Sequence, residues 1–125
     1  MPRVLVIEDN RTNMELTVLL LEMAGYIVMS ASDAETGLEM VREEHPDLVL
    51  MDVQLPGMDG LQATAILKHD QKTRTIPVIA LSALAMKGDE GRIRAAGCDG
   101  YIAKPVRYKE LWATVANYLP SRPSN

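Results

Sequence analysis

Phenylalanine is missing from this chain, and cysteine and tryptophan each occur only once among its 125 residues. Because Cys98 has no second cysteine to pair with, an internal disulfide is excluded, and a reducing, cytoplasmic location is expected. The first residues carry no secretory signal, and no apolar run approaches the length that crosses a bilayer. We therefore expect no association with a membrane.

An excess of positive charge is also missing. The net charge is −4 at pH 7, no basic cluster occurs, and aromatic residues make up only 4% of the chain, so we expect no nucleic-acid partner. Apolar residues make up 47%, which excludes a disordered chain. The length predicts one domain, expected over residues 1–120 and followed by a polar tail over 121–125. Without phenylalanine, leucine and eight methionines must fill the core.

Short apolar runs alternate with helical patterns along the whole chain. The runs predict strands over residues 3–8, 26–31, 48–52, 77–81 and 100–103. The periodic segments predict helices between residues 10 and 25, between 32 and 46, and over 61–69, 88–96 and 108–119. Five such units with right-handed crossovers form an α/β fold, in which helices cover both faces of a doubly wound parallel sheet.

Several helix ends have recognisable signals. Asn10 is a candidate cap of the first helix, and Gly25 is the expected residue just past its end. Ser32, with Glu35 three residues later, predicts a capping box for the second helix. Asp59 and Gly60 are interpreted as a turn and helix start rather than a metal site.

Polar side chains follow four of the predicted strands. Glu8 and Asp9 come after the first strand and Asp52 after the third, while Ser82 and Lys104 follow the fourth and fifth. Because the carboxyl ends of parallel strands meet at one crevice, we expect these groups to lie together. Clustered carboxylates repel one another unless a cation joins them, and hard oxygen ligands favour Mg²⁺.

This set of groups also suits phosphoryl transfer. An aspartate is a competent nucleophile toward phosphorus and would form an acyl phosphate. The reaction chiefly requires charge neutralisation, which a metal ion and Lys104 would supply from two sides. The Ser82 hydroxyl would donate a hydrogen bond to a phosphoryl oxygen.

In these residues the chain resembles the receiver domains of two-component response regulators, over essentially its whole length. The residues that carry the resemblance are Glu8-Asp9, Asp52, the loop from Pro56 to Gly60, Ser82-Ala83 and Lys104-Pro105, in that order at the strand ends. The resemblance implies a flavodoxin-like sheet with strand order 2-1-3-4-5.

The resemblance also implies a role for each residue of the site. Asp52 would accept a phosphoryl group from a phosphohistidine of a sensor histidine kinase or a histidine phosphotransfer protein. Asp9 would ligate Mg²⁺ directly and Glu8 through water, with Asp52 and the Gln54 backbone carbonyl as further ligands. Ser82 and Tyr101 match a coupled switch pair, and the Lys104–Pro105 peptide is expected to be cis. No enzymatic turnover is implied beyond self-phosphorylation and self-dephosphorylation.

Output is expected through protein contacts. The surface predicted to change on phosphorylation carries Ala85, Met86, Arg107, Tyr108 and Trp112, and would meet a downstream protein. We expect a monomer or weak dimer. The stretch from Ala83 to Glu90, with Asn10 and Asn13, is most similar to stand-alone regulators of the DivK type. A receiver cut from a hybrid histidine kinase or larger regulator is the alternative.

Three rival functions use related features. A flavin- or dinucleotide-binding domain would need a glycine-rich turn after the first strand, where Glu8-Asp9-Asn10 would repel a pyrophosphate. A Mg²⁺-dependent phosphohydrolase of the haloacid dehalogenase type would need an aspartate where Gln54 stands. An unphosphorylated scaffold would typically lack the acceptor or the lysine, whereas both Asp52 and Lys104 are present.

Overall fold

The computed structural model describes residues 1–83 and 89–119, in which strands and helices alternate. The order is β1 (Arg3–Ile7), α1 (Arg11–Met23), β2 (Ile27–Ala31), α2 (Ala34–Glu44), β3 (Leu48–Asp52), α3 (Gly60–His69), β4 (Val78–Ser82), α4 (Asp89–Ala95), β5 (Gly100–Ala103) and α5 (Tyr108–Ala116). All four strand pairings are parallel, in the order β2-β1-β3-β4-β5. The predicted fold class and strand order are confirmed.

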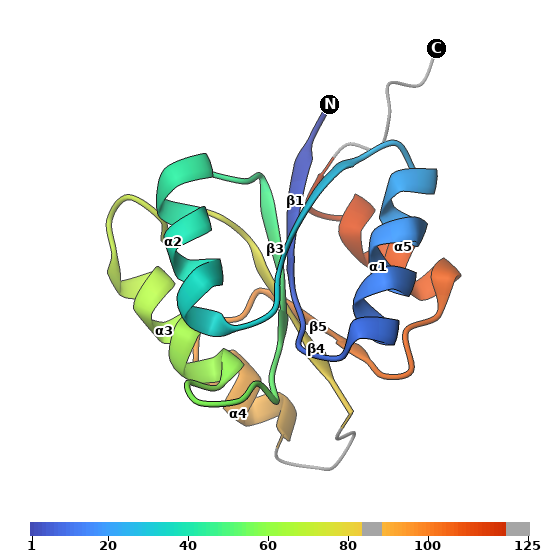
Figure 1. The fold of residues 1–125 in the computed structure, drawn as a ribbon. Coiled ribbons are helices and arrows are strands. Elements are labelled where there is room, and N and C mark those ends of the chain that lie inside the picture. The colour runs from blue at the N-terminus through green and yellow to red at the C-terminus, as the bar shows by residue number, and fades with distance from the viewer. Residues whose placement is uncertain (84–88, 120–125) are drawn as a thin grey trace.

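Helices cover both faces of the sheet (Figure 1). Alternate side chains of each strand point to opposite faces, so that Val4 and Val6 pack with α1 and α5, whereas Leu5 and Ile7 pack with α2 and α3. All five residues of both β3 and β4 are buried, as expected for central strands of a parallel sheet. No helix among the described residues is long and apolar enough to span a membrane.

The ends of α1 agree with the prediction, whereas the start of α2 does not. Asn10 caps α1 by accepting a hydrogen bond from the Asn13 N–H at 2.9 Å, and Gly25 follows the helix with φ of 95°, both as predicted. The capping box predicted at Ser32 is wrong. Asp33 is the cap of α2 instead, accepting from the Thr36 N–H at 2.7 Å. The two candidates are adjacent and both cap well, so the sequence pattern could not separate them.

The bounds of three helices differ from the prediction, since α3 begins one residue earlier, at Gly60, and α4 ends one residue earlier, at Ala95. Helix α5 ends at Ala116 rather than at residue 119, and Leu119 lies beyond it, buried against the core. Helix α4 begins at Asp89, and the predicted start at Gly88 lies outside the described residues. The capping box that the structure does contain joins Asp59 and Gln62 at the start of α3.

Candidate functional site

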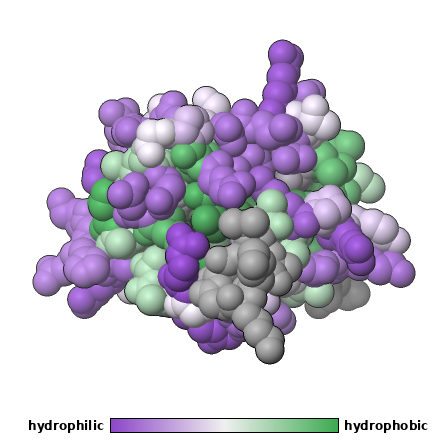
Figure 2. Space-filling model, turned by 90° about the horizontal axis from the view of Figure 1, so that it is seen from below, coloured by the Kyte–Doolittle hydropathy of each residue, from purple (hydrophilic) through white to green (hydrophobic). Residues whose placement is uncertain are grey.

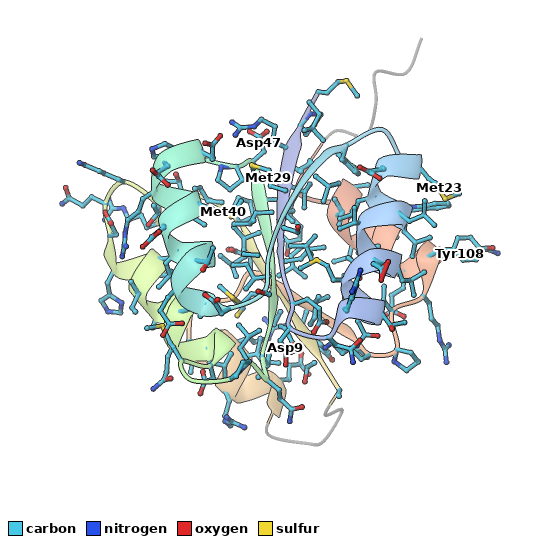
Figure 3. The ribbon with its side chains drawn as sticks, viewed as in Figure 1. Asp9, Met23, Met29, Met40, Asp47 and Tyr108 are labelled. Carbon is cyan, nitrogen blue, oxygen red and sulfur yellow. The ribbon has the colours of Figure 1, made fainter. Side chains whose placement is uncertain are left out.

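The carboxyl ends of the strands meet at one edge of the sheet, the lower edge in Figure 1. Glu8, Asp52 and Ser82 lie there almost completely buried, with exposed fractions of 2%, 2% and 4%. Asp9 is exposed beside them, and Figure 3 shows it at the same edge. The ends of these strands therefore converge as expected. Two buried acids, Glu8 and Asp52, lie at this edge of the sheet beside the exposed Asp9.

Lys104 reaches into this acidic cluster from the end of β5. Its Nζ lies 2.8 Å from Glu8 Oε1 and 3.1 Å from Asp52 Oδ2. The Lys104 backbone N–H donates to the Ser82 carbonyl at 2.8 Å, which fixes the start of this segment beside β4. The Lys104–Pro105 peptide is cis, the form that the resemblance implied. One ammonium group therefore faces two buried carboxylates.

The three carboxylates can share one cation. Glu8, Asp9 and Asp52 each offer an oxygen, and these oxygens lie within 4.8 Å of one another. Glu8 Oε1 is buried, and the Lys104 ammonium, 2.8 Å away, is its ion-pair partner. One lysine charge does not balance three carboxylates, and an all-oxygen donor set suits Mg²⁺. The residues present therefore fit this ion.

Asp52 is further held by the loop that follows it. The Gln54 N–H donates to Asp52 Oδ1 at 3.1 Å, so the backbone of Gln54 lies next to the carboxylate. Gly60, at the start of α3, lies against the Asp52 carbonyl so closely that a Cβ atom there would overlap it. The Gly60 N–H also donates to the Val53 carbonyl at 3.0 Å. The start of α3 thus positions the end of β3.

The buried charges shift one another's pKa values. The pKa of Asp52 is raised to about 7, first by burial and then by hydrogen bonding to Glu8, while Lys104 opposes the rise. Burial also acts to raise the pKa of Glu8, but its hydrogen bonds to Asp52, Lys104 and the Asn10 N–H outweigh this and lower it. Glu8 and Asp52 therefore titrate as a coupled pair, in which Asp52 keeps its proton to higher pH than an ordinary aspartate does. A bound divalent cation would replace that proton.

The predicted switch residues lie on neighbouring strands. Ser82 is buried at the end of β4, opposite Ala103 in the register, whereas Tyr101 pairs with Ala80 further back along the sheet. The Tyr101 side chain is 42% exposed. It is thus separated from the acidic cluster and lies at the surface, two residues before the strand end.

The predicted output residues fall into three groups. Arg107 and Tyr108 are exposed at the start of α5. Trp112 is only half-buried, and its Nε1–H donates to the Leu20 carbonyl of α1 at 2.8 Å. Ala85 and Met86 lie outside the described residues. The Trp112 contact joins residues far apart in the chain, and neither helical periodicity nor residue type could have predicted it.

Comparison with known proteins points to one family. A sequence model of the response regulator receiver domain matches residues 4–116. The polar-differentiation response regulator DivK of Brucella abortus (strain 2308) is 47% identical over 116 residues, covering 93% of this chain and 94% of that protein. DivK of Brucella anthropi is 47% identical over 120 residues, covering 95% and 98%.

Solved structures agree. The receiver domain of the sensor histidine kinase PA1611 from Pseudomonas aeruginosa PAO1, with a magnesium ion coordinated in its active-site cleft, has a TM-score of 0.87 at 32% identity, covering 94% of this chain and 96% of that one. The signal receiver domain of a histidine kinase from Syntrophus aciditrophicus has a TM-score of 0.88 at 31% identity, covering 100% and 96%.

Proposed function

Because this chain belongs to the response regulator receiver domain family of two-component systems, we propose that Asp52 is its phosphorylated residue. The observation that carries the proposal is the position of Asp52, buried at a strand end and 3.1 Å from the Lys104 ammonium. The phosphoryl donor is a phosphohistidine of a sensor histidine kinase or of a histidine phosphotransfer protein. The DivK relatives and the kinase-borne receivers are all consistent with such a donor.

In the proposed reaction a carboxylate oxygen of Asp52 attacks the phosphorus atom. A P–O bond forms, the P–N bond of the phosphohistidine breaks, and its electron pair stays on the imidazole nitrogen. The Lys104 ammonium stabilises negative charge on the phosphoryl oxygens, and the Ser82 hydroxyl, at the end of the neighbouring strand, donates to one of them. The Gln54 N–H holds the acceptor carboxylate in place during attack.

The proposed metal ligands follow from the acidic cluster. As the family resemblance implies, Asp9 is a direct ligand and Glu8 acts through a water molecule, and the oxygens of both lie in the acidic cluster. Asp52 and the backbone carbonyl of Gln54, next to it in the loop, complete the protein ligands. Mg²⁺ held there supplies charge neutralisation for the carboxylates and the phosphoryl group.

In this proposal the protein acts as a phosphorylation-dependent switch, and it does not catalyse a reaction of an external metabolite. Self-phosphorylation from small acyl phosphates and self-dephosphorylation are its only reactions. The receiver unit extends over residues 1–120, and Ser82 and Tyr101 couple phosphorylation to a surface that includes Arg107 and Tyr108. The DivK relatives favour a stand-alone regulator, and the two kinase-borne neighbours support the alternative of a receiver joined to a histidine kinase.

Intact-mass measurement after treatment with acetyl phosphate and Mg²⁺ tests the proposal. The wild-type protein should gain the mass of one phosphoryl group, and Asp52→Asn should gain none. Asp47→Asn is the matched control, because Asp47 is exposed at the opposite end of the sheet, where it accepts from the Arg3 N–H. Full phosphorylation of Asp52→Asn would place the acceptor elsewhere. Steady hydrolysis of a phosphate ester would favour the phosphohydrolase instead.

A further inference from the structure

Strand β2 forms one edge of the sheet, and its outer side has no neighbouring strand among the described residues. Its pairing with β1 shows which of its backbone groups face outward. The Ile27 N–H donates to the Pro2 carbonyl at 3.0 Å, and alternate residues of a parallel strand bond to the same neighbour, so residues 27, 29 and 31 bond to β1. The N–H and C=O groups of Val28 and Ser30 therefore point away from the sheet.

This edge lacks the features by which proteins usually block exposed strands. Its sequence, Ile-Val-Met-Ser-Ala, contains no proline and no charged residue, and it pairs with β1 without a bulge. Ile27 is 48% exposed. The other edge strand, β5, is different, because Asp99 precedes it and Lys104 and Pro105 follow it. β2 is therefore the edge to which a further strand can be added.

The outward groups of β2 are complementary to those of a second copy of the same strand. When two copies run antiparallel about a two-fold axis at Met29, Val28 of each lies opposite Ser30 of the other. Each of these pairs exchanges both of its N–H···O bonds, so every outward group of the two residues is satisfied. An axis at Val28 would place Ser30 opposite Tyr26, whose N–H already donates to the Leu21 carbonyl at 3.2 Å. An axis at Ser30 would place Val28 opposite a residue beyond the end of the strand.

The side chains along this edge also permit contact between two copies. Because the chain has a net charge of −4, two copies associate best where like charges do not meet, and β2 and the residue on either side of it carry no charge. Met29 lies on the axis, and it packs with Met40 against the same core cluster (Figure 3). Arg3, which contacts the Met29 sulfur, is paired with Glu44 at 2.8 Å. Flexible methionine side chains adapt well to such a contact.

We propose that β2 joins two copies of this chain edge to edge, into a symmetric dimer with one continuous sheet. Antiparallel pairing places the two acidic clusters at opposite ends of the dimer, because each cluster lies where the strands of its own copy end. Figure 2 shows that carboxyl-end edge from below, where hydrophilic residues predominate among those coloured, and the pairing leaves it uncovered. The dimer goes beyond the proposed phosphorylation, because it requires neither the phosphoryl group nor the metal. Contact through five residues is small, so the dimer is weak.

Cysteine cross-linking tests the register of this pairing. Met29→Cys places two cysteines opposite each other in a non-hydrogen-bonded pair, with Cα atoms about 4.5 Å apart, within reach of a disulfide. Ile27→Cys is the matched control, because residue 27 is exposed on the same side of β2 but lies about 13 Å along the strand from its equivalent in the second copy. After oxidation with diamide, non-reducing electrophoresis should show a covalent dimer of Met29→Cys only. The wild type, whose single cysteine, Cys98, is buried, serves as the blank.

Sedimentation equilibrium tests the unmodified protein without Mg²⁺. The wild type should dimerise reversibly between about 10 µM and about 1 mM. Ser30→Pro removes an outward N–H and no bond to β1, and it should weaken dimerisation about tenfold or more, because two bonds are lost per dimer. Ser30→Ala, which keeps the N–H, is the matched control and should change dimerisation less than about twofold. Amide exchange at Val28 and Ser30 should slow as concentration rises, while exchange at Met29 should not. Thermal unfolding verifies that each variant is folded.

Several outcomes would overturn the proposal. One is a wild type that stays a single copy over the whole concentration range. Others are equal cross-linking of Met29→Cys and Ile27→Cys, and a folded Ser30→Pro that associates as tightly as Ser30→Ala. Dimerisation that appears only after treatment with acetyl phosphate and Mg²⁺ would contradict its independence from phosphorylation. Because these measurements use protein that carries no phosphoryl group, their failure would leave the assignment of Asp52 unaffected.

Discussion

Gly60 has no side chain that could take part in phosphorylation. Replacing it with alanine should nevertheless disturb the end of β3. A Cβ atom at Gly60 would overlap the carbonyl oxygen of Asp52 and lie 3.0 Å from Met51 Cγ. The obstacle is backbone, so it cannot rotate away as a side chain would. The helix is held there by two hydrogen bonds, from the Gly60 N–H to the Val53 carbonyl and from the Thr64 hydroxyl to the Gly60 carbonyl.

The expected cost of Gly60→Ala follows from overpacking, which destabilises by about 1–3 kcal/mol. Gly91→Ala is the matched control, since a Cβ atom there has no neighbour within 4 Å. Gly91 lies in α4, where alanine is favoured over glycine by about 1 kcal/mol, so this variant should be as stable as the wild type or more stable. The two substitutions are identical in chemistry and opposite in expected sign.

Urea unfolding measures this difference directly. With a typical dependence of about 1–3 kcal/mol per M urea, Gly60→Ala should unfold at clearly lower urea than the wild type, by about 1 M. Gly60→Ala should also be phosphorylated more slowly, because the added Cβ atom presses on the Asp52 backbone and would displace the acceptor and its Gln54 contact. Equal or greater stability of Gly60→Ala would refute this account of how α3 positions Asp52.

Three further perturbations test separate parts of the structure. Mg²⁺ at roughly ten times its Kd should raise the free energy of unfolding by about 1.4 kcal/mol, and Asp9→Ala should abolish the shift in melting temperature; equal shifts would contradict the ligand assignment. Thr17→Val should stabilise the protein by about 1 kcal/mol in urea unfolding, because the buried Thr17 hydroxyl has no hydrogen-bond partner among the described residues; a loss of stability would show that it has one. Tyr101→Ala should permit phosphorylation yet reduce the amide chemical-shift changes that phosphorylation causes in β5 and α5; unchanged shifts would exclude Tyr101 from the switch.

The sequence predicted the convergence of the site because that convergence depends on only two rules. Apolar runs locate parallel strands, and the residues that follow such strands meet at one edge. These rules predict that Glu8, Asp9, Asp52, Ser82 and Lys104 lie together, and the structure has all five at this edge of the sheet.

Features that depend on contacts between elements could not be predicted in this way. The close approach of Gly60 to Asp52 requires the position of α3 relative to β3, although a glycine directly after the Asp59 cap was a signal. The bond from Trp112 to the Leu20 carbonyl joins two helices at opposite ends of the chain. The end of α5 also depends on tertiary packing, since Leu119 is buried by a turn rather than by further helix.

The central claim is that Asp52 carries the phosphoryl group, and chemical mapping of the modified residue tests it most directly. Borohydride reduces an aspartyl phosphate to homoserine, so phosphorylated protein can be reduced, digested and sequenced by mass spectrometry. Homoserine should be found at residue 52 and at none of the other aspartates, including Asp9, which lies in the same cluster. Homoserine at Asp9, or its absence from residue 52 in fully phosphorylated protein, would contradict the account.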